Sequence, residues 1–211
     1  MSTNAGWIRP PGPVASGLRV GLLGGSFNPA HEGHLHVSDV ALKRLGLDYV
    51  WWLVSPQNPL KPATGMAPLP DRLAQARLLT RHMPRIRVTG VETCLNTIYT
   101  IDTIVRLELR FPQLRFVWLM GSDNLKTFHR WRRWQELARR IPIAVVMRPG
   151  TTLAPLNAKA ARRFPARVHG ERRLADSSPP VLVVLDARRS PASATAIRTR
   201  ALGRQACGMV E

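Results

Sequence analysis

The regular alternation of short apolar runs with segments of helical periodicity is the feature that most constrains how this chain folds. Runs typical of buried strands lie at residues 18–24, 48–54, 86–91, 114–120, 143–147 and 181–185. Helical spacing is found at residues 34–46, 70–83, 97–111 and 131–140, and a last helix is expected from about Ser193 to Gly203. Because each parallel crossover needs a helix to carry the chain back, the alternation predicts an α/β fold: a doubly wound, mostly parallel sheet with helices on both faces. Ligands of such folds bind beyond the carboxyl ends of the strands.

The same pattern predicts one domain with two short tails. Residues 1–17 are rich in proline, glycine and small polar residues without periodicity, so we expect a flexible N-terminal tail. Residues 18–205 form the predicted domain and residues 206–211 a C-terminal tail. Within the domain, residues 148–180 show a poorer pattern and are expected to be irregular or partly helical.

The charge of the chain indicates a polyanionic partner. It has 31 lysine and arginine residues against 13 acidic residues, a formal net charge of +18. Such a field attracts nucleic acid, anionic lipid or phosphorylated metabolites. Arginines that only decorate a solvated surface are an equally good interpretation, because they are scattered along the chain rather than gathered in one basic arm.

Two classes of protein are not indicated by the sequence. Cys94 and Cys207 lack metal-ligand or redox-motif spacing, so neither a zinc site nor a disulfide framework is expected. No apolar run approaches the about 18–20 residues that cross a bilayer, and the first residues lack the apolar stretch of a secretory signal. We therefore expect a cytoplasmic protein with no membrane partner.

A glycine- and histidine-containing segment directly follows the first predicted strand. It reads GGSFNPAHEGH at residues 24–34. Gly24 and Gly25 would let the backbone turn sharply and let an anion approach it, and the helix that follows turns its free N–H groups toward the same place. His31 and His34 are expected side by side, where their imidazoles can donate hydrogen bonds to phosphate. Surface or helix-capping histidines are the alternative, and a metal site is less favoured because a third ligand is missing nearby.

A second candidate phosphate site lies near the other end of the chain. SATAIR, residues 193–198, opens the last predicted helix. Ser193 or Thr195 would cap amides that can also hold phosphate, and Arg198 would add a guanidinium fork beside them. Taken alone, this segment is better explained as an ordinary capped helix with a surface arginine.

Together the two segments resemble a known family. GGSFNPAHEGH is similar to the GGSFDPxHxGH signature of the HxGH nucleotidyltransferases, with Asn28 where aspartate is more usual, and SATAIR resembles their ISSTxIR motif. The resemblance implies a Rossmann-like nucleotidyltransferase fold and catalytic roles for His34, His31 and Arg198. It implies ATP-binding roles for Gly24, Gly25, Ser26, Phe27, His31, His34, Asp123, Ser193, Thr195 and Arg198.

Three further segments resemble the nicotinate mononucleotide adenylyltransferases of bacteria. They are SPQNPLK at residues 55–61, TIYTIDT at residues 97–103 and GSDNLKTFHRW at residues 121–131. The resemblance implies transfer of the adenylyl group of ATP to nicotinate mononucleotide, giving deamido-NAD and pyrophosphate. The residues implied to bind nicotinate mononucleotide are Asn58, Lys61, Thr100 and Trp131. Mg²⁺ is expected to arrive with ATP rather than to occupy a metal site of the protein itself.

Two rival interpretations remain at this point. Pantetheine-phosphate adenylyltransferase and the cytidylyltransferases share the histidine loop and differ in the acceptor pocket, where the segments at Thr100, Asp123 and Trp131 favour a pyridine nucleotide. A basic nucleic-acid-binding protein would use arginines interleaved with aromatics, as in HRWRRW at residues 129–134. Nucleic acid is not the expected partner, because that interpretation explains neither helix-start motif. The pattern predicts no particular oligomeric state.

Overall fold

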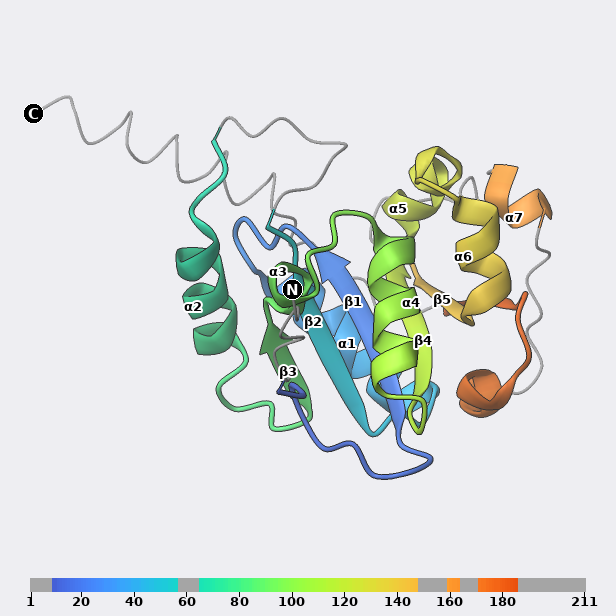
Figure 1. The fold of residues 1–211 in the computed structure, drawn as a ribbon, viewed down its shortest axis with the longest axis horizontal. Helices are drawn as coiled ribbons and strands as arrows, with labels where there is room; N and C mark the ends of the chain where they lie inside the picture. The colour runs from blue at the N-terminus through green and yellow to red at the C-terminus, as the bar shows by residue number, and fades with distance from the viewer. Residues whose placement is uncertain (1–8, 57–64, 148–158, 164–170, 186–211) are drawn as a thin grey trace, which may run out of the picture.

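A six-stranded parallel sheet forms the centre of the protein in a computed structural model that describes residues 9–56, 65–147, 159–163 and 171–185 (Figure 1). The strands are β1 (Arg19–Gly25), β2 (Tyr49–Val54), β3 (Ile86–Thr89), β4 (Arg115–Gly121), β5 (Ile143–Val146) and β6 (Leu182–Leu185). Their order is β3-β2-β1-β4-β5-β6, and every neighbouring pair is parallel. The predicted strands are therefore confirmed, with ends that differ by one or two residues.

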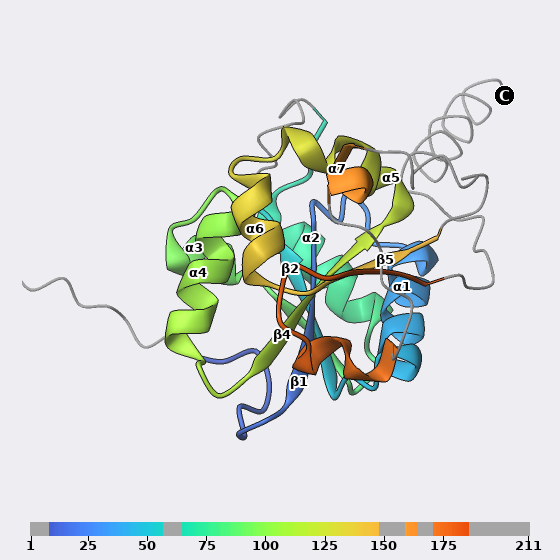
Figure 2. The same ribbon diagram turned by 90° about the vertical axis from the view of Figure 1, so that its right-hand side faces the viewer.

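Helices cover both faces of this sheet. They are α1 (Glu32–Arg44), α2 (Leu69–Leu79), α3 (Val91–Leu95), α4 (Thr100–Arg110), α5 (Ser122–Thr127), α6 (Trp134–Arg140) and α7 (Lys159–Arg163), with 3₁₀ turns η1 (Phe128–Arg130) and η3 (Glu171–Asp176). Figure 2 shows α3, α4 and α6 on one side of the sheet and α1 on the other. This arrangement confirms the predicted doubly wound α/β fold.

Three predicted helices are shorter than expected. The helix expected at residues 70–83 ends at Leu79 as α2, and the other two begin later than expected. The N-cap of α4, Tyr99, has an extended backbone with φ −104° and ψ 138°, so α4 begins at Thr100 rather than at Thr97. Arg133, with φ 51°, separates the turn η1 from α6, which therefore begins three residues later than expected. A left-handed residue cannot continue a right-handed helix, and hydrophobic periodicity does not reveal where one falls.

The strand β2 shows why the central runs are continuously apolar. Trp51 and Trp52 are adjacent, so their side chains lie on opposite faces of the sheet, and both are fully buried. Trp51 packs edge-on against Phe111 and Phe116 on the α4 side. Trp52 packs on the α1 side against Phe27. Both faces of the strand are thus part of the core.

The described part of the expected N-terminal tail contacts the domain. Residues 9–17 contain no helix or strand, but Val14 packs against the core on the α4 side. The amide of Gly17 donates to the carbonyl of Gln113 at 2.9 Å, and the Gln113 side chain donates to the carbonyl of Val14 at 3.1 Å. Burial of Val14 and these hydrogen bonds hold the segment, so its contacts begin before the boundary that we placed at residue 18.

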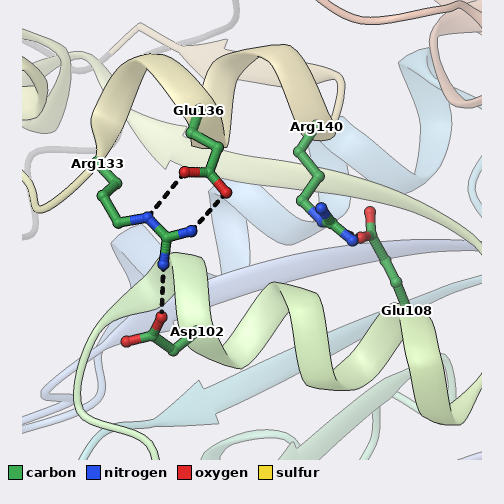
Figure 3. Close-up of polar contacts among 5 residues, drawn as sticks. All are labelled: Asp102, Glu108, Arg133, Glu136 and Arg140. Carbon is green, nitrogen blue, oxygen red and sulfur yellow. Dashed lines mark hydrogen bonds and ion pairs between the residues drawn. The ribbon is translucent and has the colours of Figure 1, made fainter.

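Ion pairs join α6 to α4 on the outer surface (Figure 3). The guanidinium of Arg133 lies 3.2 Å from the carboxylate of Asp102 and also binds Glu136. Arg140 binds Glu108 farther along each helix. Because α4 begins at Thr100 and α6 follows Trp131, these pairs connect the two segments expected to bind the acceptor nucleotide.

Among the described residues, no helix has the length and apolar character needed to cross a bilayer. The cytoplasmic location expected from the sequence stays a prediction.

Candidate active site

The candidate site lies where the direction of sheet building reverses. From β1 the chain continues to β2 and β3 on one side, whereas β4, β5 and β6 lie on the other. Leu23 of β1 is paired with Leu119 of β4, and both strands end two residues later. The loops that follow β1 and β4 therefore start side by side, at the place where open α/β sheets bind ligands.

Gly24 and Gly25, which precede the histidine loop at residues 26–34, have a different role from the one expected. Gly24 and Gly25 are the last residues of β1 and neither makes the turn. The turn is made by Phe27, whose φ is 46°. Gly24 is required because a Cβ atom there would lie 2.5 Å from Cη2 of Trp118. The expected sharp turn at the glycines was wrong, since close packing against a tryptophan, not backbone freedom, demands glycine at position 24.

Phe27 holds the loop in this conformation. A bulky residue in the left-handed region costs about 1–3 kcal/mol, and burial of a phenylalanine side chain contributes about as much. Phe27 is 1% exposed, and its ring lies 4.6 Å from that of His34 and 4.9 Å from that of Trp52, centroid to centroid. The Trp52 indole N–H donates to Ser38 at 2.8 Å. These contacts fix the loop to both β2 and α1.

The two histidines are neighbours and cap the helix α1 together. Their ring centroids are 4.0 Å apart. Nδ1 of His31 accepts from the amide of Gly33 at 3.0 Å, and Nδ1 of His34 accepts from the amide of His31 at 3.2 Å. An Nδ1 that accepts carries no proton, so a neutral imidazole has its proton on Nε2. The expected side-by-side placement and the capping alternative are both confirmed, and capping selects the tautomer that can donate through Nε2.

Asn28 connects the loop to the segment before α2. Its Nδ2 donates to the carbonyl of Gly65 at 3.0 Å, and its Oδ1 accepts from the amide of Ala67 at 3.2 Å. A carboxylate at this position could accept from an amide but could not donate to a carbonyl. The asparagine that replaces the more usual aspartate therefore makes one contact that aspartate cannot make.

Contacts through Trp118 bring the end of β1 close to Trp131, which was expected to bind the acceptor. Trp118 packs against Gly24 and lies edge-on to Trp131, with ring centroids 6.0 Å apart. Trp131 is half-buried and also contacts Phe128. Asp123 is exposed in the first turn of α5, directly after β4. Trp131 and Asp123 thus both lie near the end of β4, beside the loop of β1.

Thr100 begins α4 on the same side of the sheet. The preceding residue, Tyr99, is its N-cap, and the Arg132 guanidinium lies 4.5 Å from the centre of the Tyr99 ring. A cation over an aromatic face is attracted by the ring electrons. Arg132 directly follows Trp131, so this contact holds the start of α4 near Trp131.

A buried carboxyl group near these residues was not predicted from the sequence. Glu92 on α3 is 6% exposed, and burial raises its pKa to about 7, although hydrogen bonds from Thr103 and Ser55 oppose that rise. Thr103 lies in the first turn of α4 and its hydroxyl is 2.8 Å from that of Thr97. Glu92 therefore links the end of β2 to the start of α4. A glutamate just after a strand looks like an exposed helix start, so the sequence carried no signal for this role.

A buried arginine was also missed. Arg72 of α2 is 1% exposed. The sole sequence signal was its spacing of four from Ala76 and of eight from Thr80, which are also buried and lie on the same helix face.

Comparison with known proteins identifies the family. The family model for cytidylyltransferase-like proteins matches residues 22–200. The chain belongs to the cytidylyltransferase-like family. A relative from Parvibaculum lavamentivorans, named a probable nicotinate-nucleotide adenylyltransferase, is 54% identical over 89% of this chain and 94% of its own length. A relative of the same name from Methylorubrum extorquens is 52% identical over 87% of this chain and 100% of its own length.

A solved structure also shares the fold of this cytidylyltransferase-like chain. The nicotinic acid mononucleotide adenylyltransferase of Plasmodium falciparum, complexed with NaAD, aligns with a TM-score of 0.67. The alignment covers 86% of this chain and 83% of that protein, at 14% identity. At that identity the likeness concerns the fold alone.

Some expected site residues of this family member lie outside the described residues. They are Asn58, Lys61, Ser193, Thr195 and Arg198. Their roles, and the expected last helix, stay predictions. Within the described ranges, no group of three or more histidine, cysteine, aspartate or glutamate residues is placed to hold a metal ion.

Proposed function

We propose that the protein transfers the adenylyl group of ATP to the 5′-phosphate of nicotinate mononucleotide, a step of NAD biosynthesis. The observation that carries this proposal is the pair of histidines that cap α1 beside the β1–β4 switch point, in a chain whose curated relatives are named for this activity. The products are deamido-NAD and pyrophosphate.

The reaction depends on positioning and on neutralisation of charge. An oxygen of the acceptor phosphate attacks the α-phosphorus of ATP and forms a new P–O bond. The bond between the α-phosphorus and the oxygen that bridges to the β-phosphorus breaks, and pyrophosphate leaves. The acceptor phosphate is already anionic at neutral pH, so the protein needs no general base. Hydrogen-bond donors held in advance at the phosphates stabilise the transition state without reorganisation.

His34 and His31 supply such donors through Nε2, and His34 is assigned the larger share of the transition-state charge. Arg198, with Ser193 and Thr195, is expected to hold the β- and γ-phosphates that leave. Gly24, Gly25, Ser26 and Phe27 form the backbone beside the nucleotide, and Asp123 is placed near its ribose.

The acceptor is expected between the start of α4 and Trp131. The amide at Thr100 is assigned to the nicotinate carboxylate and the indole of Trp131 to the pyridine ring, with Asn58 and Lys61 from the loop after β2. The proximity of Trp131 to the end of β1 through Trp118 supports this arrangement.

A divalent cation, Mg²⁺, would accompany ATP and neutralise phosphate charge. The donor set fits a metal that arrives with the nucleotide: near the β1 loop the polar groups are imidazoles and amides, whereas Mg²⁺ prefers carboxylates, waters and phosphate oxygens. It would be held by the phosphate oxygens of ATP and by water, with no dedicated protein ligand.

The test is pyrophosphate release from ATP with one acceptor at a time. Nicotinate mononucleotide should support turnover, whereas phosphopantetheine should not, and nicotinamide mononucleotide should react more slowly. Turnover with phosphopantetheine alone would place the protein with the pantetheine-phosphate enzymes and overturn the proposal. Equal rates with the acid and the amide would refute the acid preference only.

A further inference from the structure

Arg72 is a charged residue that the proposed mechanism does not use. Its guanidinium makes four hydrogen bonds among the described residues, and each acceptor is a backbone carbonyl. The acceptors are Ser26 at 2.6 Å, Ser55 at 2.7 Å, Ala67 at 2.8 Å and Pro56 at 2.9 Å. One side chain therefore holds the loop after β1, the end of β2 and the entry to α2.

Burial of a guanidinium charge is costly unless its N–H groups are hydrogen-bonded. Removing a charge from water costs several kcal/mol, and the cost is offset only when its hydrogen bonds are made. The planar guanidinium offers five N–H donors in a fixed fork, so it can reach carbonyls on three segments at once. A lysine ammonium is a single point of charge and cannot span them.

The bond to Ser26 determines the direction of the next amide. In a trans peptide the C=O and the N–H point in opposite directions, and the Ser26–Phe27 peptide is trans. Since the carbonyl of Ser26 points to the buried guanidinium, the N–H of Phe27 points away from it. That amide belongs to the segment assigned to the ATP phosphates.

The end of β2 is fixed to the same loop. The amide of Ser55 donates to the carbonyl of Gly25 at 2.9 Å, and the hydroxyl of Ser55 donates to it at 3.1 Å. The carbonyls of Ser55 and Pro56 accept from Arg72. Arg72 and Ser55 thus join the last residues of two neighbouring strands.

We propose that Arg72 is a positioning residue for ATP: it holds the carbonyl of Ser26 so that the Phe27 amide faces the phosphates. The assignment rests on the proposed function of the loop as the ATP site. Arg72 touches no reacting atom, and it acts through the backbone of the histidine loop.

The first experiment compares Arg72→Lys with Arg77→Lys. Arg77 is exposed on the same helix, and lysine preserves the positive charge at both positions, so Arg77→Lys serves as the matched control. A misplacement of about 1 Å at a reacting group costs on the order of 100-fold in rate. Arg72→Lys should lose about that much in kcat/KM for ATP, while Arg77→Lys should stay within about twofold of wild type. A folded Arg72→Lys variant within about twofold of wild type would overturn the proposal.

Chemical rescue distinguishes positioning from a general loss of stability. Methylguanidinium is added at a concentration too low to denature the chain. It should raise the kcat/KM of Arg72→Ala at least about tenfold and leave the kcat/KM of Arg77→Ala unchanged. Equal stimulation of both variants, or none of either, contradicts a specific guanidinium site.

If the Arg72 variants do not fold, a measurement on the wild-type chain tests whether the Phe27 amide faces the phosphates. Hydrogen exchange of the Phe27 amide is followed with and without a non-hydrolysable ATP analogue. Slower exchange with the analogue supports the proposal, and unchanged exchange in a protein saturated with the analogue refutes it. Because this readout needs no acceptor, it stays informative even if pyrophosphate release with nicotinate mononucleotide fails.

Discussion

Arginine has two different roles in this protein, and burial decides between them. One role is that of Arg72 beneath the histidine loop, and the other is that of Arg133 and Arg140 between α4 and α6. Arg72 is 1% exposed and binds backbone carbonyls on three segments. The side chains of Arg133 and Arg140 are 48% and 36% exposed and bind carboxylates (Figure 3). Water competes for the hydrogen bonds of Arg133 and Arg140, whereas it does not reach those of Arg72.

The consequence is a difference in what each group can control. An exposed pair is screened by solvent and salt and contributes about 0–1 kcal/mol. A buried hydrogen-bonded charge leaves its partners unsatisfied when it is removed, which costs several times more. The buried groups beside β1 should therefore control rate and folding, and the α4–α6 surface should affect both only slightly.

The largest effect is expected at His34. His34→Ala removes a donor to the ATP phosphates and should lower kcat by on the order of 10²–10³, as loss of one such donor typically does. Stability should fall by only about 1 kcal/mol from the lost helix cap. Steady-state pyrophosphate release and thermal unfolding check both parts. His82, exposed after α2, is the control, and near-normal turnover of His34→Ala would remove it from the mechanism.

The next effect concerns pH and Glu92. Because its pKa is raised from 4.5 to about 7 in the folded protein, the folded state holds this proton more tightly than the unfolded chain does. The free energy of unfolding should therefore fall as pH rises from 4.5 through about 7, by on the order of 3 kcal/mol from this group.

Glu92→Gln keeps the hydrogen-bonding shape but cannot ionise. Urea unfolding at several pH values should show a smaller decline for this variant, with the larger gain over wild type above about pH 7. Glu136→Gln, on the exposed α6 surface, should leave the wild-type profile almost unchanged. Parallel profiles for wild type and Glu92→Gln would show that Glu92 does not cause the decline.

A smaller loss is expected from Gly24→Ala. The added methyl would lie 2.5 Å from Trp118, so the core must shift at a cost of about 1–3 kcal/mol. At Gly25 the nearest atom is the Phe27 ring at 3.5 Å, an ordinary contact. Gly25→Ala should therefore unfold at nearly the wild-type urea concentration, and an equal loss in both variants would contradict the assigned cause.

Trp131→Ala should change substrate binding by about tenfold. Aromatic stacking contributes about 0.5–1.5 kcal/mol beyond area burial. The KM for nicotinate mononucleotide should rise more than that for ATP. Equal changes in the two KM values would count against stacking on the pyridine ring.

The smallest effect is expected on the α4–α6 surface. Arg140→Ala breaks the pair with Glu108 and should cost less than about 1 kcal/mol, a loss that shrinks further in high salt. Urea unfolding at low and high ionic strength measures it. A loss of several kcal/mol that high salt does not reduce would remove the distinction between buried and exposed arginines.

Much of the fold was predictable because the signals are local. Apolar periodicity placed the strands, and Gly46, with φ 61°, follows the end of α1 where the sequence predicted. The histidine loop was found because its residues are contiguous. The start of α4 was missed because the extended backbone of its N-cap, Tyr99, is set by its surroundings and not by periodicity.

By itself the sequence determined the alternating elements, the sheet class and the loop that carries His31 and His34, since neighbours along the chain specify all three. Only the tertiary structure decided that Arg72 is buried, that Gly24 makes room for Trp118 and that Glu92 binds a proton strongly. These properties arise from contacts between residues far apart in sequence, such as Arg72 and Ser26, which are 46 positions apart. Desolvation and close packing act on residues that folding brings together, and composition does not reveal which ones these are.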